Sequence, residues 1–159
     1  MINQNQSTQS NTHIQFLNFY IDKNFFGINI LDIKEIIQDF ELLPIFHAPN
    51  GVRGYVNLRG QIYLIIDLRL SLGITSNTSE KTGKLILVKD RIAGQTGIIV
   101  DKIGDIITVD HKTIEIHTET KKKDIEEFKK NNLVSGVCKL KDNLMVILNI
   151  NNILDLIKT

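Results

Sequence analysis

The feature that most constrains the fold is a hairpin pattern that occurs twice in the chain. Residues 54–72 can be laid over residues 136–154 at a constant offset of 82. Each segment reads as a glycine, a strand, a basic residue at a tight turn, five apolar residues and a polar residue that can cap a short helix. Asp67 and Asn149 occupy the capping position. This predicts one supersecondary unit used twice, although two apolar hairpins can also resemble each other by chance.

The apolar residues come in short runs bounded by turn residues, which is typical of many short strands. Residues 14–21 and 25–30 read as the first two strands, whereas 31–37 fits either a short helix or a further strand. We expect the first hairpin unit to end in a short helix over Leu68–Leu72. Four or five short strands in an open sheet would leave exposed edges, and closing each half into a barrel removes them. We therefore expect a mostly β chain of two small barrels, packed side by side, with short helices.

A polar, turn-rich segment at residues 75–82 is the best candidate for a boundary between the halves. It predicts one domain over 14–159, made of two barrel subdomains at about 14–74 and 84–159. Residues 1–13 are mostly polar, so we expect a disordered tail. The tail lacks the basic start and apolar stretch of a signal peptide. No apolar run approaches the roughly 20 residues of a membrane helix. We expect a cytoplasmic protein with no direct membrane insertion.

Sequence motifs for catalysis or cofactor binding were not found. The single cysteine, Cys138, lies in an apolar stretch and fits a buried thiol in a reducing compartment. The four histidines do not have the spacing of a zinc motif. The glycines do not form a phosphate loop, and neither Ser71 nor Ser135 has the glycines of a nucleophile elbow. We therefore expect no metal, no cofactor and no enzymatic activity.

The charge balance argues against a nucleic-acid partner. The formal net charge is +1, and the chain has no tryptophan and three tyrosines. A barrel that binds nucleic acid needs a basic face with exposed aromatic side chains. A small β-barrel nucleic-acid-binding module remains the alternative function. A protein-binding adaptor agrees better with the composition.

Two polar residues stand out inside an apolar hairpin. Asn57 and Arg59 are two positions apart, so they lie on the same face of their strand, and Arg59 stands at the turn beside Gly60. A planar guanidinium there suits a carboxylate or a set of carbonyl groups on a partner. The alternative is an arginine that pairs within its own barrel.

These residues belong to a familiar motif. The stretch GYVNLRGQ at 54–61, followed by IIDLR at 65–69, resembles the signature hairpin of CheW-type chemotaxis coupling proteins. The segments 33–37, 97–103 and 136–150 resemble further parts of that family in the same order, so that the likeness covers about residues 14–157. One departure is Leu64, which replaces a proline that is usual in the family.

The resemblance implies two SH3-like five-stranded barrels and a non-catalytic adaptor function. The expected partners are the regulatory domain of a CheA-type histidine kinase and the cytoplasmic tips of chemoreceptors, which would recruit the protein to membrane-associated receptor arrays. Carried over to this chain, the resemblance implies a partner-facing surface and a groove for the receptor helix. The surface would contain Ile33, Glu35, Ile36, Asn57 and Arg59, and the groove would be lined by Val100 and Asp101.

Overall fold

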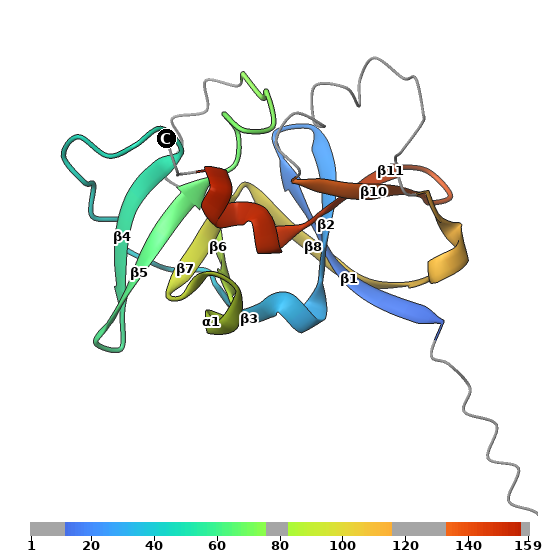
Figure 1. Cartoon of the computed structure of the whole chain (residues 1–159), viewed down its shortest axis with the longest axis horizontal. Helices are drawn as coiled ribbons and strands as arrows, with labels where there is room; N and C mark the ends of the chain where they lie inside the picture. Colours follow the sequence, from blue (N-terminus) through green and yellow to red (C-terminus); the bar gives the residue numbers. More distant parts are fainter. Residues whose placement is uncertain (1–11, 76–82, 116–132, 157–159) are drawn as a thin grey trace, which may run out of the picture.

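The computed structural model describes residues 12–75, 83–115 and 133–156, and these residues are nearly all β (Figure 1). In chain order the strands are β1 (His13–Ile21), β2 (Asn24–Asn29), β3 (Ile33–Ile37), β4 (Val52–Leu58), β5 (Gln61–Asp67), β6 (Lys84–Val88), β7 (Thr96–Val100), β8 (Lys102–Asp110), β9 (Ile114–Glu115), β10 (Val134–Lys139) and β11 (Leu144–Leu148). Short 3-10 helices are η1 (Ile30–Asp32), η2 (His111–Thr113) and η3 (Ile150–Leu156), and α1 (Asp90–Ala93) is one α-helical turn. Of the expected tail, residues 1–11 lie outside the described residues.

The strands form two sheets that lie side by side in Figure 1. The central sheet has the order β3-β6-β7-β5-β4, and the terminal sheet, built from both ends of the chain, has the order β8-β1-β2-β11-β10-β9. The expected mostly β fold with two β units is thus confirmed. The terminal sheet, however, has six strands because the two-residue β9 is added at its edge.

The expected division into subdomains 14–74 and 84–159 is wrong for the described strands. β1 and β2 pair with strands of the second half, whereas β6 and β7 pair with strands of the first. Four strand pairs join the two halves. β1–β8 and β3–β6 are antiparallel, whereas β5–β7 (Ile65 opposite Gly97) and β11–β2 (Ile147 opposite Gly27) are parallel. A sequence repeat identifies equivalent strands, but it does not say which unit each hairpin joins. The first two strands of each repeat complete the sheet of the other.

The predicted repeat itself is confirmed in atomic detail. The β4–β5 ladder shifts register between Val52 and Gly54, and the β10–β11 ladder shifts between Val134 and Gly136, at the same offset of 82. The two capping residues also act alike. Asp67 Oδ1 accepts from the N–H two residues on at 3.0 Å, and Asn149 Oδ1 does the same at 3.2 Å.

The helix expected over Leu68–Leu72 is not formed. The segment is a series of turns, with one helical hydrogen bond of 2.9 Å from the Leu72 N–H to the Leu68 carbonyl. In the second repeat the equivalent region is the 3-10 helix η3. One reason for the difference is Gly73, whose φ of +69° places the backbone in the left-handed region and ends the turn.

Each sheet curls until its two edges meet. β3 and β4 are the edges of the central sheet, and an ion pair joins Glu35 of β3 to Arg59 at the end of β4. β8 and β9 are the edges of the terminal sheet, and the single turn η2 connects them directly. Curling in this way covers edges that would otherwise be free to pair with other chains.

The largest apolar core lies between the two sheets. It contains Phe19 and Phe26 from the terminal sheet, together with Ile66, Ile86 and Ile98 from the central sheet. η3 covers the junction and adds further apolar side chains to it (Figure 1). We call this cluster the shared core.

Each sheet also has a core of its own on its other face. Along β5, Ile65 belongs to the core inside the central sheet, and the next residue, Ile66, belongs to the shared core. Along β11, Ile147 and Leu148 divide in the same way between the core of the terminal sheet and the shared core. Strands that bury both faces read as unbroken apolar runs, which explains the sequence pattern.

We predict that Gly54→Ala lowers the free energy of unfolding by roughly 1–3 kcal/mol, because the new Cβ overpacks a closed site. That Cβ would overlap the carbonyl oxygen of Leu43, and the φ of +149° also favours glycine. Gly60→Asn is the control, because a Cβ at Gly60 meets nothing within 4 Å and asparagine tolerates a positive φ. Urea denaturation of both variants measures the difference. Equal stability of the Gly54→Ala variant and the parent protein would contradict this packing.

Candidate functional site

The candidate site is built on the turn between β4 and β5. Leu58 pairs with Gln61, so Arg59 and Gly60 form a two-residue loop, and their φ values are +53° and +82°. Two positive φ values match a type I′ turn, which suits the twist of a hairpin. Asn57 Oδ1 accepts a 3.1 Å hydrogen bond from the Gly60 N–H. Asn57 therefore shapes the turn that presents Arg59.

Arg59 and Glu35 are paired with each other. Arg59 Nη2 lies 2.5 Å from Glu35 Oε1, although the arginine side chain remains 78% exposed. Arg59 therefore does pair within its own unit, which was the alternative expectation, yet its guanidinium stays accessible to a partner. Such an exposed pair contributes only about 0–1 kcal/mol to stability. Its main effect is to hold the arginine in one orientation over the edge of β3.

Apolar side chains are exposed on the same unit. Ile36 is exposed on β3, next to Glu35. On the hairpin, Asn57 lies opposite Ile62 and Tyr55 lies opposite Leu64, so these side chains share the outer face. Tyr55 and Ile62 are both exposed. The sequence analysis missed them, although their alternation with the buried Val56 and Tyr63 carried the signal.

The distribution of such side chains favours the central unit. Among the described residues, nine large apolar side chains are exposed, and seven of them lie between Leu31 and Leu70. Polar rims with exposed aliphatic and aromatic side chains are typical of protein-binding surfaces. We call Glu35, Ile36, Tyr55, Arg59 and Ile62 the hairpin surface.

Lys34 fixes the edge strand β3 in place. Its Nζ donates to Tyr63 Oη at 2.9 Å and lies 3.1 Å from Asp90 Oδ1. The hydrogen bonds to Tyr63 and to Asp90 raise the pKa of Lys34 above its ordinary value. Glu35 and Ile36 are thereby held at the surface, whereas Ile33 is half-buried against the shared core.

Val100 cannot line the groove that was expected at Val100 and Asp101. Val100 is fully buried in the shared core, because it follows Ile98 on the face of β7 that meets the terminal sheet. Asp101 is partly exposed but already engaged. One carboxylate oxygen accepts from the Asp22 N–H at 2.5 Å, and the other is paired with Arg69. The structure therefore does not bring these two residues together with Arg59 on one surface.

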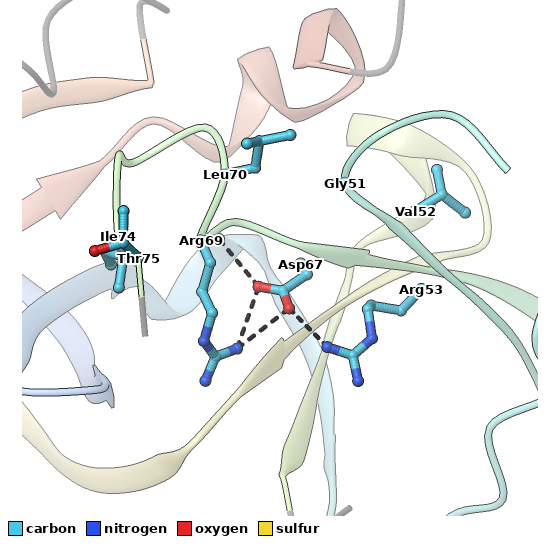
Figure 2. A pocket seen from close by; sticks show the side chains of 8 residues that line it. All are labelled: Gly51, Val52, Arg53, Asp67, Arg69, Leu70, Ile74 and Thr75. Carbon is cyan, nitrogen blue, oxygen red and sulfur yellow. Dashed lines mark hydrogen bonds and ion pairs between the residues drawn. The ribbon is translucent and has the colours of Figure 1, made fainter. Parts of the chain in front are cut away.

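An open pocket of about 420 Å³ lies between the start of β4 and the turns that follow β5 (Figure 2). Its lining residues are Gly51, Val52, Arg53, Asp67, Arg69, Leu70, Ile74 and Thr75. Asp67 sits between two guanidinium groups, 2.9 Å from Arg53 Nη1 and 3.2 Å from Arg69 Nη1. The polar residues of the motif at 65–69 thus form an ion-pair network at the floor of the pocket, while Leu68 is buried in the shared core.

The surroundings of Arg69 favour its charged form. Burial alone lowers its pKa, but the hydrogen bond to Asp101 and the charges of Asp67 and Asp101 outweigh burial, so the pKa is raised above its ordinary value. Arg69 is only 13% exposed, so this arginine is a fixed part of the structure.

The described residues offer neither a metal centre nor a membrane-spanning helix. They contain no group of three or more His, Cys, Asp and Glu side chains placed to hold a metal ion. Their helices include none that is long and apolar enough to span a membrane.

Comparison with known proteins identifies the family. A model of the CheW-like domain matches residues 15–158. The chain is 32% identical to the chemotaxis protein CheW of Helicobacter pylori over 143 residues, which cover 89% of this chain and 81% of that protein. It is 24% identical to the chemotaxis protein CheW of Thermotoga maritima, over 89% of this chain and 87% of that protein.

A solved structure agrees with this match. The crystal structure of the scaffolding protein TtCheW from Thermoanaerobacter tengcongensis superposes with a TM-score of 0.72 at 28% identity, covering 86% of this chain and 88% of that one. The same two-sheet arrangement is therefore found in a solved relative. The chain belongs to the CheW-like domain family.

Proposed function

We propose that this protein is a non-catalytic adaptor that couples chemoreceptors to a CheA-type histidine kinase. The observation that carries the proposal is the hairpin surface, where an exposed arginine paired with Glu35 lies on the same sheet as exposed apolar side chains. The relatives support the biological setting, because they are named as chemotaxis proteins and one solved relative is called a scaffolding protein.

The hairpin surface is the proposed docking site for the regulatory domain of the kinase. Arg59 has five N–H donors, and its contact with Glu35 through Nη2 leaves others to meet carbonyls or carboxylates on a partner. Ile62, opposite Asn57 on the hairpin, and Ile36 on β3 supply exposed apolar area on the same sheet. A surface of this size gives a modest interface, which many simultaneous contacts in a receptor array would strengthen.

Recruitment by chemoreceptor tips would bring the protein from the cytoplasm to the membrane. Because Val100 is buried, the receptor contact must use residues other than this one. The alternative of a nucleic-acid-binding module gains no support from the relatives, and the net charge of +1 gives little attraction to phosphates.

We predict that Arg59→Ala weakens binding to the kinase regulatory domain by tenfold or more, or about 1.4 kcal/mol. An arginine near the centre of an interface is a frequent hot spot. Lys141→Ala is the matched control, because Lys141 occupies the equivalent turn of the terminal sheet and is also exposed. Isothermal titration calorimetry against the kinase domain and against a receptor tip measures both. Equal losses in the two variants, or none in either, would refute the assignment to the central sheet.

We also predict that stability and binding separate at Arg59. Arg59→Asn should leave the free energy of unfolding unchanged or higher, because asparagine adopts the left-handed conformation more readily and Asn-Gly favours a type I′ turn. The lost ion pair offsets only about 0–1 kcal/mol. Binding should still fall as in Arg59→Ala.

Ile65→Ala provides the contrast. Ile65 is fully buried inside the central sheet, and its truncation should cost roughly 2–5 kcal/mol of stability. Thermal and urea melts alongside the titrations decide the matter. If Arg59→Asn instead destabilises the protein as strongly as Ile65→Ala, the arginine is a structural residue.

A further inference from the structure

The chain passes between the two sheets at two points within the described residues. At the first, η1 connects β2 of the terminal sheet to β3 of the central sheet. At the second, Asp101 alone connects β7 of the central sheet to β8 of the terminal sheet. A connection of one residue has few backbone dihedrals that can vary, so the conformation of Asp101 affects how the two sheets are oriented.

Asp101 is bonded to both sheets. Its N–H donates to the Tyr20 carbonyl at 3.0 Å, and its Oδ2 accepts from the Asp22 N–H at 2.5 Å. Tyr20 lies at the end of β1, and Asp22 lies in the turn that follows it. Asp101 Oδ1 is paired with Arg69, which follows β5 of the central sheet. One carboxylate therefore ties the β1–β2 turn to the central sheet.

On the central sheet, Arg69 is fixed in place by Asp67. Its Nη1 lies 3.2 Å from both oxygens of Asp67, and Asp67 is held in turn by Arg53 at 2.9 Å (Figure 2). Arg69 Nη2 is left to reach Asp101. A planar guanidinium that bridges two carboxylates has little freedom to rotate.

The shared core joins the sheets firmly but does not by itself choose an angle. Apolar burial is non-directional and depends mainly on the area removed from water. Close packing limits the range of angles between the sheets, and a directional contact can select one angle within that range. An ion pair with low exposure is directional and is lost when its partners separate.

We infer that Asp101 and Arg69 form a clamp that sets the angle between the two sheets. They act as positioning residues, because the pocket floor at Asp67 and the β1–β2 turn are held in one arrangement through them. The inference concerns the orientation of the two sheets and stands apart from the proposed adaptor function.

The test compares two carboxylates on the same arginine. Asp101→Asn removes the charge that crosses between the sheets but keeps an oxygen to accept from the Asp22 N–H. Asp67→Asn removes a charge within the central sheet only, and Asn149 shows that asparagine can serve as the cap at this position of the repeat. The two variants are therefore matched in chemistry and differ in the sheets that they connect.

The readout is an interspin distance measured by double electron–electron resonance. Spin labels are placed on cysteines at Gln61 of β5 and Thr108 of β8, both exposed, in a Cys138→Ala background. We expect Asp101→Asn to shift and broaden the distance distribution relative to the parent protein. Asp67→Asn should change the distribution less, because Asp101 stays paired with Arg69.

An unchanged distribution in folded Asp101→Asn protein would overturn the clamp. So would an equal change in both variants, because the effect would then belong to Arg69 generally and not to the crossing. If Asp101→Asn does not fold, Arg69→Lys takes its place. Lysine lacks the planar fork with which Arg69 reaches Asp67 through Nη1 and Asp101 through Nη2, so the clamp again predicts a broader distribution, and an unchanged one refutes it. No partner protein enters the measurement.

Discussion

The structure depends on strands that must be buried on both faces. In β5, β7 and β11, successive side chains alternate between a sheet's own core and the shared core. Neither sheet could expose its shared-core face, which carries Ile98 in the central sheet and Phe26 in the terminal sheet, to water without a large loss of hydrophobic stabilisation. The exchange of hairpins between the repeats reinforces this dependence, because each sheet contains two strands from the other half. The two units therefore fold as one domain, and the junction between them is as much a core as either interior.

Curling of the central sheet is what creates the hairpin surface. Glu35 and Arg59 are 24 positions apart and lie on opposite edges of the sheet in hydrogen-bonding order. They meet only because the sheet closes around Ile65, Leu85 and Ile99. Lys34 and Tyr63 strengthen the same closure from beside it. The binding proposed for this surface is thus linked to the packing beneath it, while the arginine itself remains accessible.

Much of this arrangement could be predicted from the sequence. The repeat at an offset of 82, the capping role of Asp67 and the exposure of Arg59 follow from local patterns, because turns and strand alternation are set by neighbouring residues. The pairing of β2 with β11 could not be predicted in this way, because the sequence of a continuous apolar strand does not indicate which strand lies next to it. Val100 was misassigned for the same reason. Its burial depends on the sheet that packs over it, and the sequence motif does not reveal that sheet.

The two equivalent turns show where the repeats have diverged. Leu140 and Asn143 are hydrogen-bonded around Lys141 and Asp142, as Leu58 and Gln61 are paired around the Arg59 turn. Gly60 permits a turn with two positive φ values, whereas neither Lys141 nor Asp142 has a positive φ. Holding a non-glycine residue in the left-handed region costs about 1–2 kcal/mol, and such strain is concentrated at functional sites. The strained arginine is found on the sheet that also exposes Ile36, Tyr55 and Ile62. A non-glycine residue with positive φ and exposed apolar side chains are thus found together on this hairpin unit, whereas the equivalent turn at Lys141 has no positive φ.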